Sequence, residues 1–152
     1  MDCSIIKIHS DLFELIRYLR EYKKEDDEYI ERCRKIHEGT DECYVVVIDD
    51  ICIADVTVTL KSVDRSAVVE NYRAYLSGLF VKEAYRNMKI ATMLVEHVFK
   101  ELSDKGFKEL SVLVDESNTP ACALYSKLGF EWEKSYKIDQ WTFALLVYRM
   151  IK

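Results

Sequence analysis

The chain has 152 residues, with 27 acidic and 22 basic side chains, and its formal net charge at pH 7 is −5. Hydrophobic residues account for 49% and charged residues for 32%, the balance of an ordinary globular protein. An acidic chain is poorly suited to sequence-independent nucleic-acid binding, so we expect no nucleic-acid partner. The sequence has no run of about 18 apolar residues and no leader-like start, so it predicts no membrane span.

The cysteines and histidines argue against disulfide and metal chemistry. Five cysteines are an odd number and include no Cys-x-x-Cys pair, which is typical of a reduced, cytoplasmic chain. His9, His37 and His97 are scattered without the spacing of metal ligands, so we expect no metal. No Gly/Ser-rich or Pro-rich linker interrupts the sequence. We therefore predict one domain over residues 1–152.

The first half of the chain predicts a strand, two helices and two further strands. In chain order these are a strand over residues 4–8, helices over 12–22 and 29–36, and strands over 44–48 and 51–60. Ser10 is a candidate cap for the first helix, and Gly39 a stop for the second. The acidic residues 25–28 indicate solvated surface, or alternatively a rim that attracts a cationic amine. We interpret Asp55, within the last strand, as an exposed outward-facing residue.

The second half predicts a strand–helix–strand unit, which is right-handed in nearly all proteins. Residues 68–81 form a long strand with a bulge at Ser77-Gly78, which would splay it from its neighbour. A helix follows, with Asn87 as its cap, an apolar 3.6-residue stripe and Gly106 beyond its end. The stripe consists of Ile90, Leu94, Val98 and Leu102. The remaining elements are a strand over 110–114, a Pro-started helix from Asn118, and strands over 131–138 and 141–151.

The turn between residue 81 and the central helix is a candidate anion site. A helix N-terminus exposes unpaired N–H groups and carries partial positive charge. Arg86 and Lys89 add full charges there, with Lys82 nearby. These residues alone leave two interpretations open, a solvated basic loop and a phosphate cradle.

Residues 79–130 carry two motifs that decide between these interpretations. The first is the loop Arg86-Asn87-Met88-Lys89-Ile90-Ala91, which follows an apolar strand end. The second comprises Asn118, Ala121, Tyr125 and Gly129-Phe130. Together they resemble the Arg/Gln-x-x-Gly-x-Gly/Ala loop and the Asn…Ala…Tyr…Gly-Phe segment of the GCN5-related N-acetyltransferase (GNAT) superfamily. Lys89 stands in place of the family's first loop glycine.

The resemblance implies the fold and the reaction. The expected fold is a mixed α/β (α+β) architecture, with a mostly antiparallel central sheet of six to seven strands and helices on both faces. The expected element order is β-α-α-β-β-β-α-β-α-β-β. The expected activity is an acetyl-CoA-dependent N-acyltransferase that moves the acetyl group directly to a primary amine of a small molecule or peptide. Acetyl-CoA would be the cosubstrate.

The resemblance also implies roles for individual residues. Tyr125 is placed as the acid for the CoA sulfur, and a strand N–H near Val81 would polarise the thioester carbonyl. Some members place a glutamate base where this chain has Leu113, so Asp115 is our candidate base, with Glu70 and Tyr75 as alternatives. Deprotonation of the amine through water is the remaining alternative. The expected cofactor-binding residues are Leu79, Phe80, Val81, Arg86, Asn87, Met88, Lys89, Ile90, Ala91, Thr92, Asn118 and Tyr125.

Two other functions remain open at this stage. One is a catalytically inactive member that binds acyl-CoA as a sensor or subunit, which the missing glycine and glutamate favour. The other is a protein-interaction domain that keeps only the fold. In that case pairing of the last strands of two chains could form a homodimer.

Overall fold

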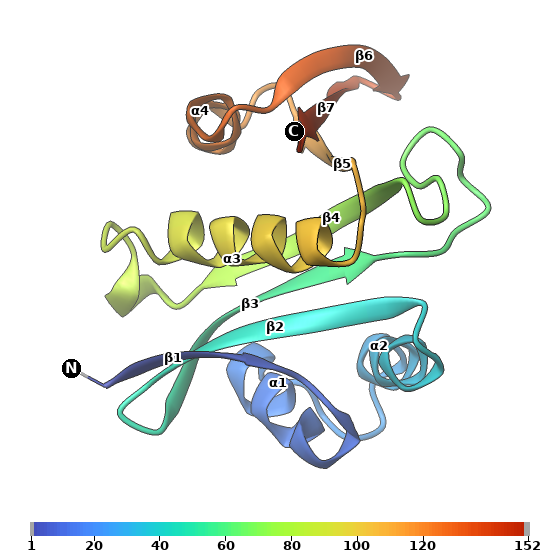
Figure 1. The fold of residues 1–152 in the computed structure, drawn as a ribbon. Helices are drawn as coiled ribbons and strands as arrows, with labels where there is room; N and C mark the ends of the chain where they lie inside the picture. The colour runs from blue at the N-terminus through green and yellow to red at the C-terminus, as the bar shows by residue number, and fades with distance from the viewer. Residues whose placement is uncertain (1, 151–152) are drawn as a thin grey trace.

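A sheet of seven strands runs through the computed structural model, which describes residues 2–150 (Figure 1). The strand order is β1-β2-β3-β4-β5-β7-β6. The strands are β1 (Cys3–Lys7), β2 (Asp41–Ile48), β3 (Ile51–Thr59), β4 (Arg73–Val81), β5 (Glu109–Asp115), β6 (Glu131–Ile138) and β7 (Trp141–Arg149). Neighbouring strands are antiparallel except β4 and β5, which are parallel. The predicted mixed, mostly antiparallel sheet is confirmed.

Four helices and two 3₁₀ turns complete the described chain. They are η1 (Ser10–Leu12), α1 (Phe13–Arg20), α2 (Asp27–Glu38), η2 (Glu83–Tyr85), α3 (Ile90–Asp104) and α4 (Thr119–Leu128). The order of helices and strands is the predicted one. None of these helices is both long and apolar enough to cross a bilayer.

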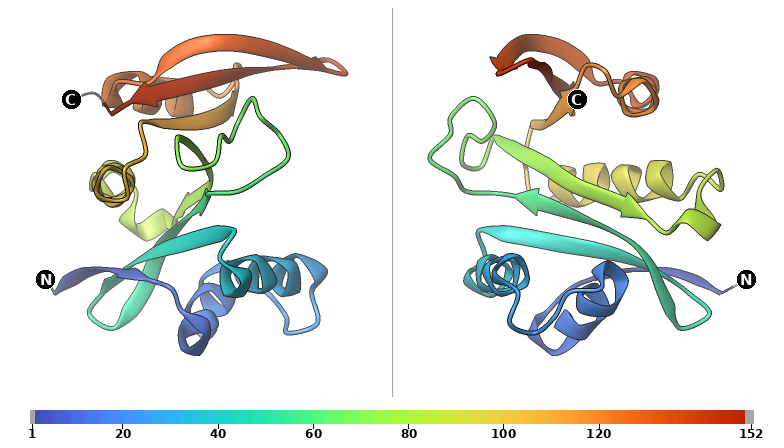
Figure 2. Two further views of the ribbon diagram at one scale, coloured as in Figure 1. Left: turned by 45° about the vertical axis from the view of Figure 1, so that its right-hand side comes forward. Right: turned by 180° about the vertical axis from the view of Figure 1, so that it is seen from behind.

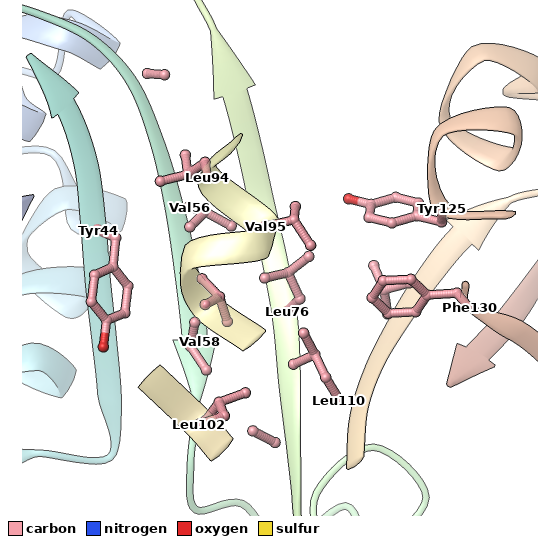
Figure 3. Close-up of a cluster of buried hydrophobic side chains, with 14 of the residues drawn as sticks. Tyr44, Val56, Val58, Leu76, Leu94, Val95, Leu102, Leu110, Tyr125 and Phe130 are labelled. Carbon is pink, nitrogen blue, oxygen red and sulfur yellow. The ribbon is translucent and has the colours of Figure 1, made fainter. Parts of the chain in front are cut away.

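The helices cover both faces of the sheet, as predicted. In the left view of Figure 2, α3 is seen end-on at one side of the strands, whereas α2 lies at the other. The apolar stripe of α3 is buried in the larger of two cores, and Figure 3 shows Leu94 and Val95 beside Val56 and Leu76. Buried residues of α1 and α2 belong to a second cluster on β2. Because each helix has one apolar stripe, each needs one sheet face to bury it.

Two predicted elements differ from the structure near their first residues. The strand predicted over 68–81 begins only at Arg73, because residues 69–73 form a tight turn. In that turn the Arg73 N–H donates to the Val69 carbonyl (2.7 Å), and Asn71 has a φ of +62°. Ser10 does not cap α1: the helix begins after Leu12, and the Ser10 hydroxyl lies 3.2 Å from His37 Nδ1. The predicted strand end at residue 151 lies outside the described residues.

Asp55 is the clearest correction to the sequence analysis. We expected it to be exposed, but its side chain is 0% exposed and is held by two ion pairs. The reason is that β3 lies inside the sheet with helices on both sides, so both of its faces are covered. A carboxylate in such a strand requires cationic partners, which other elements supply.

Candidate active site

The parallel strands β4 and β5 separate halfway along their length. Their register runs from Arg73↔Glu109 to Leu76↔Val112 and goes no further, although β4 continues to Val81. The separation begins next to Gly78, which has a φ of +63° and lies at a register shift between β3 and β4. A left-handed residue at a bulge is readily supplied by glycine. The predicted bulge and splayed strand are confirmed.

Backbone groups at the end of β4 face this opening. The Lys82 N–H donates to the Ile53 carbonyl of β3 (2.8 Å). Because successive residues of a strand turn their backbone groups to opposite sides, the N–H and carbonyl of Val81 point away from β3. Phe80, which is paired with Asp55, turns its backbone groups toward β3. Of these two residues, Val81 therefore offers backbone groups to the opening, and Phe80 does not.

A cavity of about 320 Å³ lies where the opening meets the first turn of α3. It is lined by Val81, Tyr85, Arg86, Asn87, Lys89, Ile90, Ala91, Thr92 and Leu124. Apart from Tyr85 and Leu124, these are residues that the sequence predicted to bind the cofactor. Met88 is 45% exposed and lies outside this lining, as do Leu79, Phe80, Asn118 and Tyr125.

The loop before α3 uses two left-handed residues. Asn87 has a φ of +67° and Lys89 a φ of +62°, and α3 begins at Ile90. The predicted Asn87 cap is wrong: the cap position is Lys89, and no side chain caps the helix. N–H groups in the first turn of a helix have no intrahelical acceptor, so those of Ile90, Ala91 and Thr92 are available to an anion. Lys89 thus keeps the backbone conformation that a glycine would adopt.

Arg86 bridges the loop and the strand. Its Nε donates to the Val81 carbonyl (2.9 Å), and the side chain lines the cavity. The guanidinium therefore brings a full positive charge to the end of the opening. It lies near the uncapped helix N-terminus, whose partial charge has the same sign.

Helix α4 supplies the second motif from the β5 side. Asn118 Oδ1 accepts a hydrogen bond from the Ala121 N–H (3.2 Å) and so caps α4, and Pro120 lies in the first turn. Tyr125 is 5% exposed, and its ring packs edge-on against Phe130 at 5.2 Å between centroids. Its hydroxyl points from α4 toward β4 (Figure 3). Burial raises the pKa of Tyr125 to about 12, with nearby Tyr75 adding to the effect, so the phenol stays protonated at neutral pH.

A family comparison identifies this arrangement. The model of the Acetyltransferase (GNAT) family matches residues 5–130. The chain belongs to the GNAT family.

A curated relative supports this family assignment. The chain is 31% identical to an N-alpha-acetyltransferase MAK3 of Arabidopsis thaliana over 88 residues. These 88 residues are 58% of this chain and 44% of that protein. This chain thus matches less than half the length of that relative.

Solved structures share the fold at low sequence identity. An N-acetyltransferase from Staphylococcus aureus Mu50 has a TM-score of 0.79 and 18% identity, and the match covers 99% of this chain and 100% of that one. Arabidopsis thaliana NAA60 in complex with acetyl-CoA has a TM-score of 0.74 and 22% identity, over 98% and 99% of the two chains. At this identity the likeness establishes the GNAT fold of the chain.

The candidate bases of this GNAT chain lie in different surroundings. Asp115, at the end of β5, accepts hydrogen bonds at Oδ1 from the N–H (2.9 Å) and hydroxyl (2.8 Å) of Ser117. Tyr75 is half-buried, and burial raises its pKa. Glu70 is exposed in the turn before β4, where it pairs with Lys61 at 3.8 Å.

Among the described residues, no group of three or more His, Cys, Asp or Glu could hold a metal.

Two further cavities lie on the α1–α2 side of the sheet. One, of about 280 Å³, reaches from α2 to the bulge and is lined by Arg20, Tyr22, Glu28, Glu31, Arg32, Lys35, Asp41, Thr57, Ser77 and Gly78. The other, of about 270 Å³, includes Tyr75, Leu113 and Tyr136 and shares Lys35 with the first. Sequence reasoning identified the helical pair but missed Arg20, Arg32 and Tyr136. The only signal for the arginines was a carboxylate, Asp55, within an apolar strand.

Proposed function

We propose that this chain is an acetyl-CoA-dependent N-acetyltransferase that transfers the acetyl group directly to a primary amine of a small molecule or peptide. One observation carries the proposal: the β4–β5 opening has at its end a cavity lined by Arg86 and the uncapped N-terminus of α3, and a buried tyrosine beside it. An extended thioester-bearing arm and its phosphates fit such a site together. We further propose that residues 1–152 act as one cytoplasmic domain.

The donor would bind from the α3–α4 side. Its pyrophosphate would accept hydrogen bonds from the N–H groups of residues 90–92, with Arg86 adding charge. Its pantetheine arm would pair with the backbone of Leu79 and Val81 as an added strand does, with Val81 offering its N–H because its carbonyl already accepts from Arg86 Nε. Asn118 uses its oxygen to cap α4, which leaves its amide N–H groups for the arm. Phe80 and Met88 would lie at the margin of the site.

The reaction needs three groups in this opening. The Val81 N–H would donate to the thioester carbonyl oxygen and stabilise the negative charge that develops there. The amine nitrogen forms its bond to the carbonyl carbon, and the carbon–sulfur bond breaks. The thiolate takes its proton from the Tyr125 hydroxyl, which burial keeps protonated. A base removes the proton that the attacking amine loses.

We propose Asp115 as that base, with Tyr75 as the competing candidate. Asp115 lies at the end of β5, one turn before α4, and its carboxylate is oriented by Ser117. Tyr75 lines a cavity on the acceptor side and lies close enough to Tyr125 to influence its pKa. The turnover of Asp115→Asn and of Tyr75→Phe separates the two, because only the variant that lacks the base should lose roughly 100-fold or more in kcat.

The acceptor would bind on the α1–α2 side, opposite the donor. The two cavities there end at the bulge and at Tyr75, so an amine placed in either approaches the opening from behind β4. Because the Arabidopsis relative is described as an N-alpha-acetyltransferase, the α-amine of a peptide is the first acceptor to test. Polyamines and aminoglycoside-like amines form the second group.

The test joins binding and turnover. Calorimetry with acetyl-CoA and with dephospho-CoA should give micromolar binding, which corresponds to about −8 kcal/mol. Release of CoA is then followed across peptide and small-molecule amines. Tyr125→Phe should lower kcat by roughly 100-fold or more, as expected for loss of a general acid, with little change in acetyl-CoA affinity. Tyr72→Phe, at an exposed turn position, is the matched control.

Three outcomes would count against the proposal or part of it. An unchanged kcat in Tyr125→Phe removes Tyr125 as the acid. Binding without turnover on any amine favours the second candidate, an inactive acyl-CoA-binding protein, which Leu113 in place of the glutamate and Lys89 in place of the glycine support. Absence of acetyl-CoA binding at millimolar ligand rejects both functions and leaves a protein-interaction domain.

A further inference from the structure

A buried charge cluster lies directly behind the β4 bulge. Asp55, on β3, is fully buried and is paired with Arg20 from the end of α1 (Nη2–Oδ1, 2.9 Å) and Arg32 from α2 (Nη2–Oδ2, 2.7 Å). A buried carboxylate keeps its charge only when cationic donors satisfy both oxygens, and here two arginines do so together. The ion pairs at Asp55 therefore connect α1, α2 and β3, which are distant from one another in the sequence.

Arg20 extends this cluster to the strand that faces the opening. Its Nε donates to both Asp55 oxygens (3.0 and 3.2 Å), and its Nη2 donates to the Gly78 carbonyl (2.5 Å). The same guanidinium lies over the Phe80 ring, 4.7 Å from its centroid. Arg20 thus contacts β4 on both sides of Leu79, whereas Arg32 donates to Asp55 and to Thr57 of β3.

The bulge is the part of β4 that most needs such a contact. Beyond Leu76 the strand has lost its β5 partner, and at Gly78 its register with β3 shifts. Here β4 is paired with β3 alone, and a glycine at such a position can adopt many alternative backbone orientations. The charge-assisted bond from Arg20 to the Gly78 carbonyl holds this backbone in one orientation, three residues before the Val81 N–H.

We propose that Arg20 is a positioning residue: held by Asp55, it fixes the β4 bulge so that the backbone of residues 79–81 meets the thioester in the reactive orientation. This inference rests on the proposed acetyltransferase function. Arg32 supports it indirectly, because it supplies the second countercharge and lets Asp55 hold Arg20 in one place. Arg20 itself touches neither the acetyl group nor the amine.

The experiment compares Arg20→Ala, Arg20→Lys and the control Arg17→Ala. Arg17 lies one turn earlier on the same helix and pairs with Glu14 at its surface. We expect kcat/KM for acetyl-CoA to fall at least tenfold in Arg20→Ala, with an intermediate loss in Arg20→Lys, which keeps the charge but not the fork of donors. Arg17→Ala should stay within twofold of the wild type.

Two further readouts separate positioning from general stability. Hydrogen exchange should quicken at the amides of residues 79–82 in Arg20→Ala and remain unchanged in α3. Methylguanidinium should restore part of the lost rate, because Arg20 borders the 280 Å³ cavity and is 21% exposed there. Wild-type efficiency in either Arg20 variant, or exchange that quickens equally throughout the chain, would overturn the proposal.

The outcomes remain distinguishable if a variant or the parent function fails. Should Arg20→Ala not fold, Arg20→Lys decides the matter, because it retains the countercharge of Asp55. A wild-type protein that neither binds nor turns over acetyl-CoA rejects the proposed function. In that case the exchange at residues 79–82 still shows whether Arg20 holds the bulge.

Discussion

Replacing Lys89 by glycine should make this protein more stable, although glycine usually destabilises. Lys89 has φ +62° and ψ +22°, a left-handed conformation that costs a residue with a Cβ about 1–2 kcal/mol. Glycine removes that cost but adds roughly 0.5–1 kcal/mol of backbone entropy to the unfolded chain. The net gain is therefore about 0.5–1 kcal/mol, and for a domain of this size it raises the Tm by about 2 °C.

Lys82→Gly provides the matched control for this prediction. Lys82 also lies near the α3 N-terminus and loses the same charge, but its φ is −55°, which every residue adopts easily. Only the entropic term then applies, so its Tm should fall by about 2 °C. The assay is thermal unfolding of the two variants and the wild type in one buffer. If Lys89→Gly unfolds at or below the temperature of Lys82→Gly, the left-handed conformation of Lys89 carries no measurable cost.

Two further predictions concern stability. Burial raises the pKa of Asp41, whose Oδ1 has no partner among the described residues, so the ionised form destabilises the fold at neutral pH. Asp41→Asn should therefore raise the Tm at pH 7, and the gain should shrink as the pH falls toward the unfolded value of 3.8; a constant gain contradicts this. Gly129→Ala should lower the Tm by more than Gly106→Ala in parallel melts. Both glycines have positive φ, but only at Gly129 would a Cβ approach the Tyr148 ring, at 3.2 Å, adding about 1 kcal/mol; equal losses would exclude this contact.

Local chemistry made much of the fold predictable. The stripe from Ile90 to Leu102 repeats every turn, so it specifies both a helix and the face that it buries. Asn118 and Pro120 specify the start of α4 through short-range effects that need no tertiary partner. The glycine at position 78 indicated a bulge because the strand pattern continues on both sides of it. Signals of this kind depend on neighbours within a few residues.

The errors have a common physical origin in contacts between distant segments. Asp55 was misplaced because its two arginines lie 35 and 23 positions away in sequence, where no periodicity links them. The Asn87 cap was wrong because the loop takes two left-handed residues, which postpones the helix to Ile90. The first residues of the predicted strand from 68 are apolar, but the turn at Asn71 reverses the chain there. The positions of Arg20 and Arg32 follow only from the packed helices.

The β4–β5 opening, with cavities on its two sides, has a consequence for the order of events during turnover. Free CoA would leave past α3 and α4, whereas the acetylated amine would leave past α1 and α2. Neither product then obstructs the path of the other. With the donor and acceptor on the sides proposed above, the architecture would impose no obligatory release sequence, and a bulky acceptor such as a polypeptide could remain docked while one cosubstrate is exchanged for the next.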